Sequence, residues 1–247
     1  SQNPFAGGGV WLWLSGAAGL ADPLCIETLA DAHPLWAADL RGLAPWREIL
    51  LGPEAGPAAG QWLVAGGGAG RTVAPVCCVG TCGSSLDVAH AFIAGGLLGP
   101  FASVLAVSQR SGRGQMRREW ISPAGNIYAA LRWPQDGGAV EAMASVVVGA
   151  CLADGFAAMG HDARVKWPND LLLDGRKVGG ILLEERAGAL VAGVGINLAS
   201  APDPTRLRRD HATLATRLSD FGRLPGAVTV WTELVKSAQT CYRQSVT

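Results

Sequence analysis

The lysines are the first residues in this sequence whose placement suggests chemistry. The chain has seventeen arginines but only three lysines, and Lys166 and Lys177 lie within one window of twelve residues. Where arginine is the usual cation, a retained lysine indicates a need for a compact ammonium group that reaches a carboxylate or phosphate as a point charge. Surface placement is the alternative for each lysine, and lysine usage alone does not decide between the two.

A segment rich in glycine and arginine, residues 109–120, is the second candidate. Gly112 and Gly114 flank Arg113, so backbone N–H groups there can approach an anion that the guanidinium also contacts. Trp120 at the end of the segment offers a flat face to a base or another ring. An ordinary solvated loop is the alternative.

The third candidate is the end of a predicted strand, residues 193–198. Its glycines permit close approach of the backbone to a ligand, and the amide of Asn197 can hold a phosphate oxygen or a metal-bound water. A turn or capping role for Asn197 is equally compatible with the sequence.

Regular elements begin after residue 75 and must position these groups. Asp174-Gly175 between two short apolar runs predicts a tight hairpin. Antiparallel strands with helices grouped around them indicate an α+β domain, with a mixed, mainly antiparallel sheet flanked by helices. The predicted strands are residues 76–79, 104–107, 126–133, 164–167, 171–173, 180–184 and 190–197, and the predicted helices are 87–97, 139–159, 205–219 and 227–245.

The sequence divides near residue 75. We predict an N-terminal extension over residues 1–75, of unassigned role, and a main domain over 76–247. Five of the nine tryptophans lie in the extension, where packing is their expected use. Residues 5–21 predict a buried or interfacial strand, residues 53–60 and 66–70 predict loops, and no helix-turn-helix pattern is visible.

Composition excludes several classes of protein. Of the 247 residues 49% are hydrophobic, enough for a large core. Twenty basic and twenty acidic residues cancel, so we expect no nucleic-acid partner. No stretch matches a membrane helix, so we expect no membrane partner. The six cysteines are too sparse for a disulfide scaffold and indicate buried thiols in the reducing cytoplasm, with a metal site at Cys77, Cys78 and Cys82 as the alternative.

Together these segments resemble one family, the biotin–protein ligases, over about residues 78–200. The most specific motifs are Lys166-Trp-Pro-Asn-Asp170 and Lys177-Val-Gly-Gly-Ile-Leu-Leu-Glu184. The others are Gly112-Arg-Gly114, Trp120-Ile-Ser-Pro123, Gly125-Asn-Ile-Tyr128 and Gly193 to Leu198. The resemblance implies a class II synthetase-like biotin/lipoate ligase catalytic domain over residues 76–247. We expect the C-terminal small β-barrel of longer members to be absent.

The resemblance also implies a two-step reaction with ATP and Mg²⁺. The carboxylate of biotin attacks the α-phosphorus of ATP, which gives biotinoyl-AMP and pyrophosphate. A lysine of a biotin carboxyl carrier protein then attacks this mixed anhydride. Because two anions meet in the first step, cations are needed where the charge accumulates.

The family's functional positions carry over residue by residue. By this match Lys177 and Arg113 are the catalytic cations at the junction of the biotin carboxyl group and the α-phosphate. Asp170 is the magnesium ligand, or else it braces the hairpin that carries Lys177. The biotin-binding set is Ser84, Ser85, Leu86, Gln109, Arg113, Gly114, Gln115, Lys177 and Gly180. The ATP-binding set is Arg113, Arg117, Arg118, Trp120, Asn169 and Asn197.

Two departures from the family pattern keep alternatives open. Leu86 stands where the family usually has asparagine, and Gln115 stands where it has arginine. The alternatives are a lipoate– or octanoate–protein ligase, and a biotin-binding regulator that no longer transfers. A regulator would normally need a DNA-binding arm, for which residues 1–75 give no support.

Gln115 leads to a prediction about retention of the intermediate. A less charged loop should hold biotinoyl-AMP less firmly, so we expect more of it to escape than from relatives. The measurement is labelling of bystander lysines by the chain and by a Gln115→Arg variant. Labelling by the unaltered chain that is no greater than by the variant would contradict this prediction.

Overall fold

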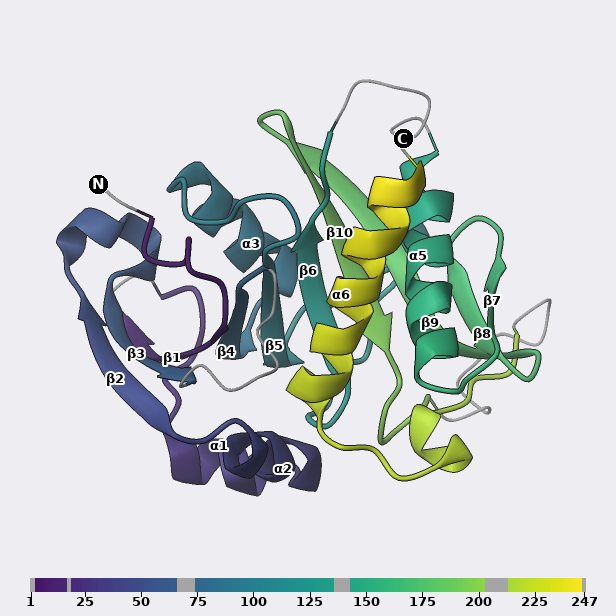
Figure 1. Cartoon of the computed structure of the whole chain (residues 1–247), viewed down its shortest axis with the longest axis horizontal. Coiled ribbons are helices and arrows are strands. Elements are labelled where there is room, and N and C mark those ends of the chain that lie inside the picture. Colours follow the sequence, from purple (N-terminus) through teal and green to yellow (C-terminus); the bar gives the residue numbers. More distant parts are fainter. Residues whose placement is uncertain (1–2, 17–18, 66–73, 136–142, 203–212, 246–247) are drawn as a thin grey trace.

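One continuous sheet runs through the whole molecule (Figure 1). The computed structural model describes residues 3–16, 19–65, 74–135, 143–202 and 213–245. Its ten strands follow the order β2-β3-β1-β4-β5-β6-β10-β9-β8-β7. The strands are β1 (Val10–Gly16), β2 (Trp46–Leu51), β3 (Gly60–Ala65), β4 (Val76–Cys82), β5 (Ser103–Gln109), β6 (Ile127–Arg132), β7 (Ala163–Lys166), β8 (Asp170–Leu173), β9 (Arg176–Arg186) and β10 (Ala189–Ile196).

The pairing of the strands confirms the predicted sheet. The pairs β1–β4 and β4–β5 are parallel, and the remaining neighbours are antiparallel. The sheet is therefore mixed and mainly antiparallel. The predicted Asp174-Gly175 hairpin joins β8 to β9, with φ of 48° and 69° at its two residues, as a tight hairpin turn requires.

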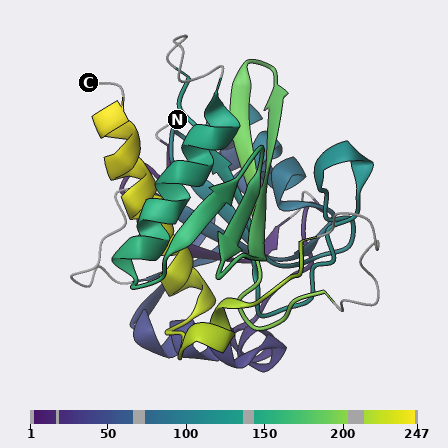
Figure 2. The same cartoon turned by 90° about the vertical axis from the view of Figure 1, so that its right-hand side faces the viewer.

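Helices cover both faces of the sheet. Buried side chains of α1 (Ile26–Ala32), α2 (Pro34–Gly42), α5 (Ala144–Ala158) and α6 (Ala227–Ser245) belong to one hydrophobic cluster, and those of α3 (Ser85–Ala94) belong to the other. Figures 1 and 2 show α5 and α6 together on one side of the sheet. Along β4, Cys78 packs in the first cluster and Cys77 in the second, because successive side chains of a strand alternate between faces.

The segment before residue 75 is built into this sheet. Its strand β1 pairs with β4 across the predicted boundary, so the division at residue 75 does not separate two sheets. The predicted buried strand within residues 5–21 is confirmed by β1, whose first four residues are buried. The tryptophans of this segment pack: Trp11, Trp13 and Trp62 gather with Phe5 and with Phe92 of α3 at ring-centroid separations of 4.8–6.3 Å.

Two sequence predictions need comment. The predicted helix over 205–219 is wrong over residues 213–217, because this segment runs beside β9 instead: Lys177 N donates to Leu214 O, and Thr216 N donates to Lys177 O. A short 3-10 helix, Leu218–Phe221, begins only at the end of the predicted range. Residues 203–212 lie outside the described part, as do residues 136–142 at the start of the predicted helix 139–159 and the predicted loop 66–70. The predicted loop at residues 53–60 forms a short 3-10 helix, Pro53–Ala58.

Within the described residues, no helix combines the length and apolar character that a membrane crossing requires.

A buried carboxylate ties the N-terminal segment to the C-terminal helix. Asp39 of α2 is 2% exposed, and its side chain accepts hydrogen bonds from Val228 N (2.7 Å), Thr229 N (3.1 Å) and Thr229 Oγ1 (2.7 Å). These donors lie in the first turn of α6, whose N–H groups have no partner within the helix. Asp39 therefore caps α6 from a position 189 residues earlier in the chain.

Removing this cap should destabilise the fold. We expect Asp39→Ala to lower the free energy of unfolding by about 1–2 kcal/mol, the usual cost of losing a side-chain cap. Urea unfolding followed by circular dichroism measures the change. Asp31→Ala is the matched control, because Asp31 is an exposed aspartate of the neighbouring helix. Equal effects of the two substitutions would contradict the capping role.

Candidate active site

A cavity of about 770 Å³ opens on the face of the sheet that α3 covers. It brings together the sequence-predicted site residues from both ends of the main domain. The residues that the resemblance assigned to the site all line it except Arg117, whose side chain lies outside the described part of the structure. They come from the start of α3, the end of β5, the loop before β6, and strands β8, β9 and β10. Lys166, the other lysine of the sequence-predicted window, is not among the lining residues, and its Nζ donates to Thr213 Oγ1 at 2.6 Å.

Glycines on β9 and β10 make room for the floor of this cavity. A Cβ atom on Gly195 would lie 2.4 Å from Cε2 of Trp120, and one on Gly180 would lie 3.1 Å from Cζ3 of the same ring. A Cβ atom on Gly193 would lie 2.9 Å from Cδ1 of Leu86. The indole of Trp120 and the side chain of Leu86 therefore lie directly on bare strand backbone.

Lys177 lies beside this floor and is paired with Asp170. Its Nζ is 2.5 Å from Asp170 Oδ1 and 5.5 Å from the centre of the Trp120 ring. The two side chains are 27% and 20% exposed, so the pair is reachable from the cavity. The pair joins the two strands of the hairpin that carries Lys177, which is compatible with the bracing role that the sequence left open for Asp170.

The same carboxylate fits the other role in part. Magnesium in nucleotide enzymes is commonly held by one or two carboxylates together with substrate phosphates and waters. Asp170 lines the cavity and supplies one such carboxylate. Among the described residues no cluster of three or more His, Cys, Asp or Glu side chains is arranged to hold a metal ion, so a protein-only metal cage is not formed there.

Arg113 is held by two carboxylates that the sequence analysis did not single out. Its Nη1 donates to Asp87 Oδ2 (2.8 Å) and its Nε donates to Glu184 Oε1 (3.0 Å). Arg186 contacts the same two carboxylates, at 3.0 Å from Asp87 and 2.6 Å from Glu184. This four-residue network, Asp87, Arg113, Glu184 and Arg186, links α3, the glycine–arginine loop and β9.

A signal for one member of this network was present in the sequence. Residues two and four apart on a strand share a face, so Glu184 had to lie on the same face as Gly180, a predicted site residue. Nothing local indicated Asp87. Burial acts to raise the pKa of Asp87, but hydrogen bonds and positive charge from Arg113, and then from Arg186, outweigh it and hold that pKa below its ordinary value.

Gln109 is bonded within the protein. Ser85 N and Oγ donate to Gln109 Oε1 at 2.8 and 3.1 Å, and Gln109 Nε2 donates to Ser122 Oγ at 2.9 Å. Ser122 Oγ donates in turn to Trp120 O at 2.8 Å. Gln109 thereby connects the start of α3 to the segment that carries Trp120. Ser122, to which the sequence analysis gave no role, is the link between them.

Asn126 fixes the backbone that follows β10. Its Oδ1 accepts from the backbone N–H groups of residues 198, 199 and 200 at 2.9–3.1 Å, and its Nδ2 donates to Ser200 O at 2.9 Å. Asn197 lies at the end of β10, and its Nδ2 donates to Thr216 O at 3.1 Å. Asn126 fixes the chain after β10, whereas Asn197 lines the cavity.

A comparison with family models matches one part of the chain. Residues 102–200 match the model of the biotin/lipoate A/B protein ligase family. The match contains Gln109, Arg113, Asp170 and Lys177, together with the cavity floor on β9 and β10.

Two curated proteins are similar to part of this chain. A biotin--[acetyl-CoA-carboxylase] ligase of Paracoccus denitrificans is 47% identical over 120 residues, which are 45% of this chain and 50% of that protein. The bifunctional ligase/repressor BirA of Escherichia coli is 42% identical over 103 residues, 38% of this chain and 32% of that protein. The matches thus span half or less of these relatives' length.

Solved structures share the fold. The biotin protein ligase from Leishmania major in complex with biotinyl-5-AMP has a TM-score of 0.55 at 25% identity, over 67% of this chain and 75% of that one. The biotin protein ligase from Aquifex aeolicus in complex with biotin and ATP has a TM-score of 0.57 at 19% identity, over 68% and 70% of the two chains. The ligase fold and its sheet are therefore shared with this chain.

The carboxylate–arginine network predicts a titration change. In an Arg113→Gln variant Asp87 loses its largest favourable partner, so we expect the pKa of Asp87 to move upward. Carboxyl ¹³C chemical shifts followed against pH measure this pKa. Arg110→Gln is the matched control, because Arg110 pairs with the exposed Asp22 instead. An unchanged Asp87 titration in Arg113→Gln would contradict the observed pairing.

Proposed function

We propose that this chain is an ATP-dependent biotin–[biotin carboxyl carrier protein] ligase. The observation that carries the proposal is the placement of two cations, Lys177 and Arg113, in one cavity, each beside carboxylates. The names of the curated relatives and the ligands of the similar structures support biotin and ATP as its substrates.

In the first step an oxygen of the biotin carboxylate attacks the α-phosphorus of ATP. The bond from that phosphorus to the pyrophosphate oxygen breaks, which leaves biotinoyl-AMP and pyrophosphate. Lys177 offsets the charge that gathers at the new carboxyl–phosphate junction, and its cavity position beside Trp120 keeps its ammonium group within reach of both anions. Arg113 contributes its positive charge to the same junction, while four hydrogen bonds hold its guanidinium to Asp87 and Glu184.

The protein controls these cations before the substrates bind. Lys177 is paired with Asp170, and Arg113 with Asp87 and Glu184, so each cation has a fixed direction in the cavity. Positioned charges of this kind need little reorganisation during the reaction. Asp170 is also the residue that would hold Mg²⁺, and the ion when bound would neutralise part of the phosphate charge.

In the second step the ε-amine of an acceptor lysine attacks the acyl carbon of biotinoyl-AMP. The amide bond forms, the bond to AMP breaks, and the amine loses a proton. The loop over residues 113–118 borders the cavity and would shield the anhydride from water until the acceptor arrives. We propose a cytoplasmic location for this enzyme, consistent with its six unpaired cysteines.

An alternative to biotin as the acid substrate stays open. Leu86 presents an apolar side chain to the cavity against Gly193, where the resemblance would place an asparagine amide. A more apolar acid such as lipoate or octanoate would use that surface. The experiment below therefore compares the three acids.

The test is exchange of labelled pyrophosphate into ATP, with Mg²⁺ and with biotin, lipoate or octanoate as the acid. We expect exchange with biotin, and a Lys177→Gln variant should lose it by about 10²–10³-fold because a charge-stabilising donor at the junction is removed. Lys236→Gln is the matched control, since Lys236 pairs with Glu233 on the surface of α6. Exchange with lipoate or octanoate alone would replace biotin in the proposal, and biotin binding without exchange would indicate a regulator.

A further inference from the structure

Helices α5 and α6 approach each other closely on the face of the sheet opposite the cavity. The contact is centred on Gly155, where a Cβ atom would lie 2.9 Å from Leu234 Cδ2 and 3.2 Å from Ser237 Cβ. The absence of a side chain at residue 155 therefore allows the two backbones to pack at short range.

This contact brings two cysteines together. Cys151 lies four residues before Gly155 on α5, and Cys241 lies four residues after Ser237 on α6, so in this antiparallel pair each is one turn from the contact on the same side. The two thiols are close enough for each to influence the pKa of the other, and Asp154 also acts on the pKa of Cys241.

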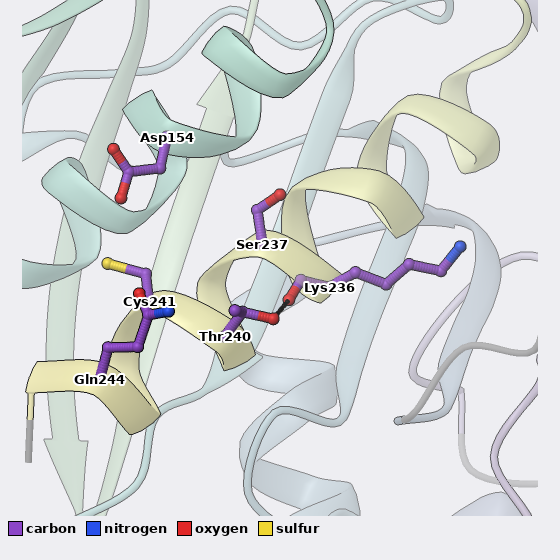
Figure 3. A pocket seen from close by; sticks show the side chains of 6 residues that line it. All are labelled: Asp154, Lys236, Ser237, Thr240, Cys241 and Gln244. Atoms are coloured by element: carbon purple, nitrogen blue, oxygen red, sulfur yellow. Dashed lines mark hydrogen bonds between the residues drawn. The ribbon is translucent and has the colours of Figure 1, made fainter. Parts of the chain in front are cut away.

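Only one of the two thiols is reachable from solvent. Cys151 is fully buried, whereas Cys241 is half-buried and lines a cleft of about 300 Å³. Figure 3 shows the sulfur of Cys241 directed toward α5, below the carboxylate of Asp154. The other residues that line the cleft are Lys236, Ser237, Thr240 and Gln244.

We propose that Cys151 and Cys241 form a thiol-modification site, which a low-molecular-weight disulfide such as oxidised glutathione converts to an interhelical disulfide. This site is separate from the proposed active site and does not depend on the proposed function. The half-buried Cys241, which lines the cleft, is the entry point, and the buried Cys151 is the resolving thiol.

Formation of the protein disulfide converts one small disulfide into two molecules of small thiol. The Cys241 thiolate attacks one sulfur of the small disulfide, forms a mixed disulfide and expels one thiolate. The Cys151 thiolate then attacks the Cys241 sulfur, which closes the protein disulfide and expels the second thiolate. The two cysteine protons end on the two released thiols, so the protein is oxidised by two electrons and the small disulfide is reduced.

The surroundings of the pair make this exchange slow at neutral pH. Burial raises the pKa of Cys241, and Asp154 adds to that effect, while Cys151 opposes it. A smaller thiolate fraction lowers the rate of attack. The site is therefore suited to prolonged oxidising conditions rather than to rapid signalling.

A disulfide here would fasten two helices that support different parts of the fold. Ser145 in the first turn of α5 donates to Pro168 O at 3.0 Å, within the Lys166–Asp170 motif, and α6 is capped by Asp39. Linking α5 to α6 closes a long loop of chain, which restricts the unfolded state. The oxidised protein should therefore unfold at a higher temperature, by several degrees.

The experiment uses the full chain with Cys25→Ser, because Cys25 is exposed and would otherwise react. The protein is incubated with oxidised glutathione, its remaining thiols are alkylated, and its peptides are mapped by mass spectrometry. We expect loss of two hydrogens from the protein mass, a cross-linked peptide pair that contains Cys151 and Cys241, and a raised unfolding temperature that dithiothreitol restores to its starting value.

Two variants in the same background serve as controls. Cys241→Ser should abolish both the cross-link and the rise in unfolding temperature. Cys151→Ala should leave a mixed disulfide with glutathione on Cys241 that cannot resolve, and it keeps the test valid if the first variant folds poorly. A stable mixed disulfide on Cys241 in the parent protein, or full alkylation of both cysteines after oxidation, would overturn the proposal.

Discussion

The cavity exists because three positions on the inner strands β9 and β10 carry no side chain. Gly180 and Gly195 admit the ring of Trp120 onto the strand backbone, and Gly193 admits Leu86. Any side chain at Gly195 would occupy the place of that ring, because its first carbon would already lie 2.4 Å away. The floor, the position of Trp120 and the contact of that ring with Lys177 all depend on this bare backbone.

A second constraint is that every principal cation of the site is neutralised within the protein. Lys177 has Asp170, and Arg113 shares Asp87 and Glu184 with Arg186. Partly exposed pairs of this kind contribute little to folding stability. Their main effect is directional, since they hold flexible side chains in defined places without leaving an unpaired charge in a half-buried cavity.

The N-terminal segment supports this arrangement from outside it. Strand β1 extends the sheet beyond β4, and Asp39 caps the helix that covers the opposite face. The ring of His33, which caps α2, lies against Gly125, where a Cβ atom would meet it at 2.5 Å. Gly125 directly precedes Asn126, so the segment packs beside the residue that fixes the chain after β10. The early part of the sequence thus stabilises the elements that carry the cavity.

The sequence by itself determined the chemistry and much of the local structure. The spacing of Lys166, Lys177 and the glycine–arginine loop indicated an anion site, and the period of the apolar residues predicted most strands and helices of the main domain.

The tertiary structure decided which distant residues and strands pair with each other. Asp87 and Glu184 lie 26 and 71 residues from Arg113, and β1 lies more than sixty residues before the strand with which it pairs. The local pattern of apolar residues does not predict contacts between residues so far apart in the sequence. For the same reason residues 213–216 run beside Lys177 rather than forming the expected helix, because backbone hydrogen bonds to a distant strand outweigh a local preference.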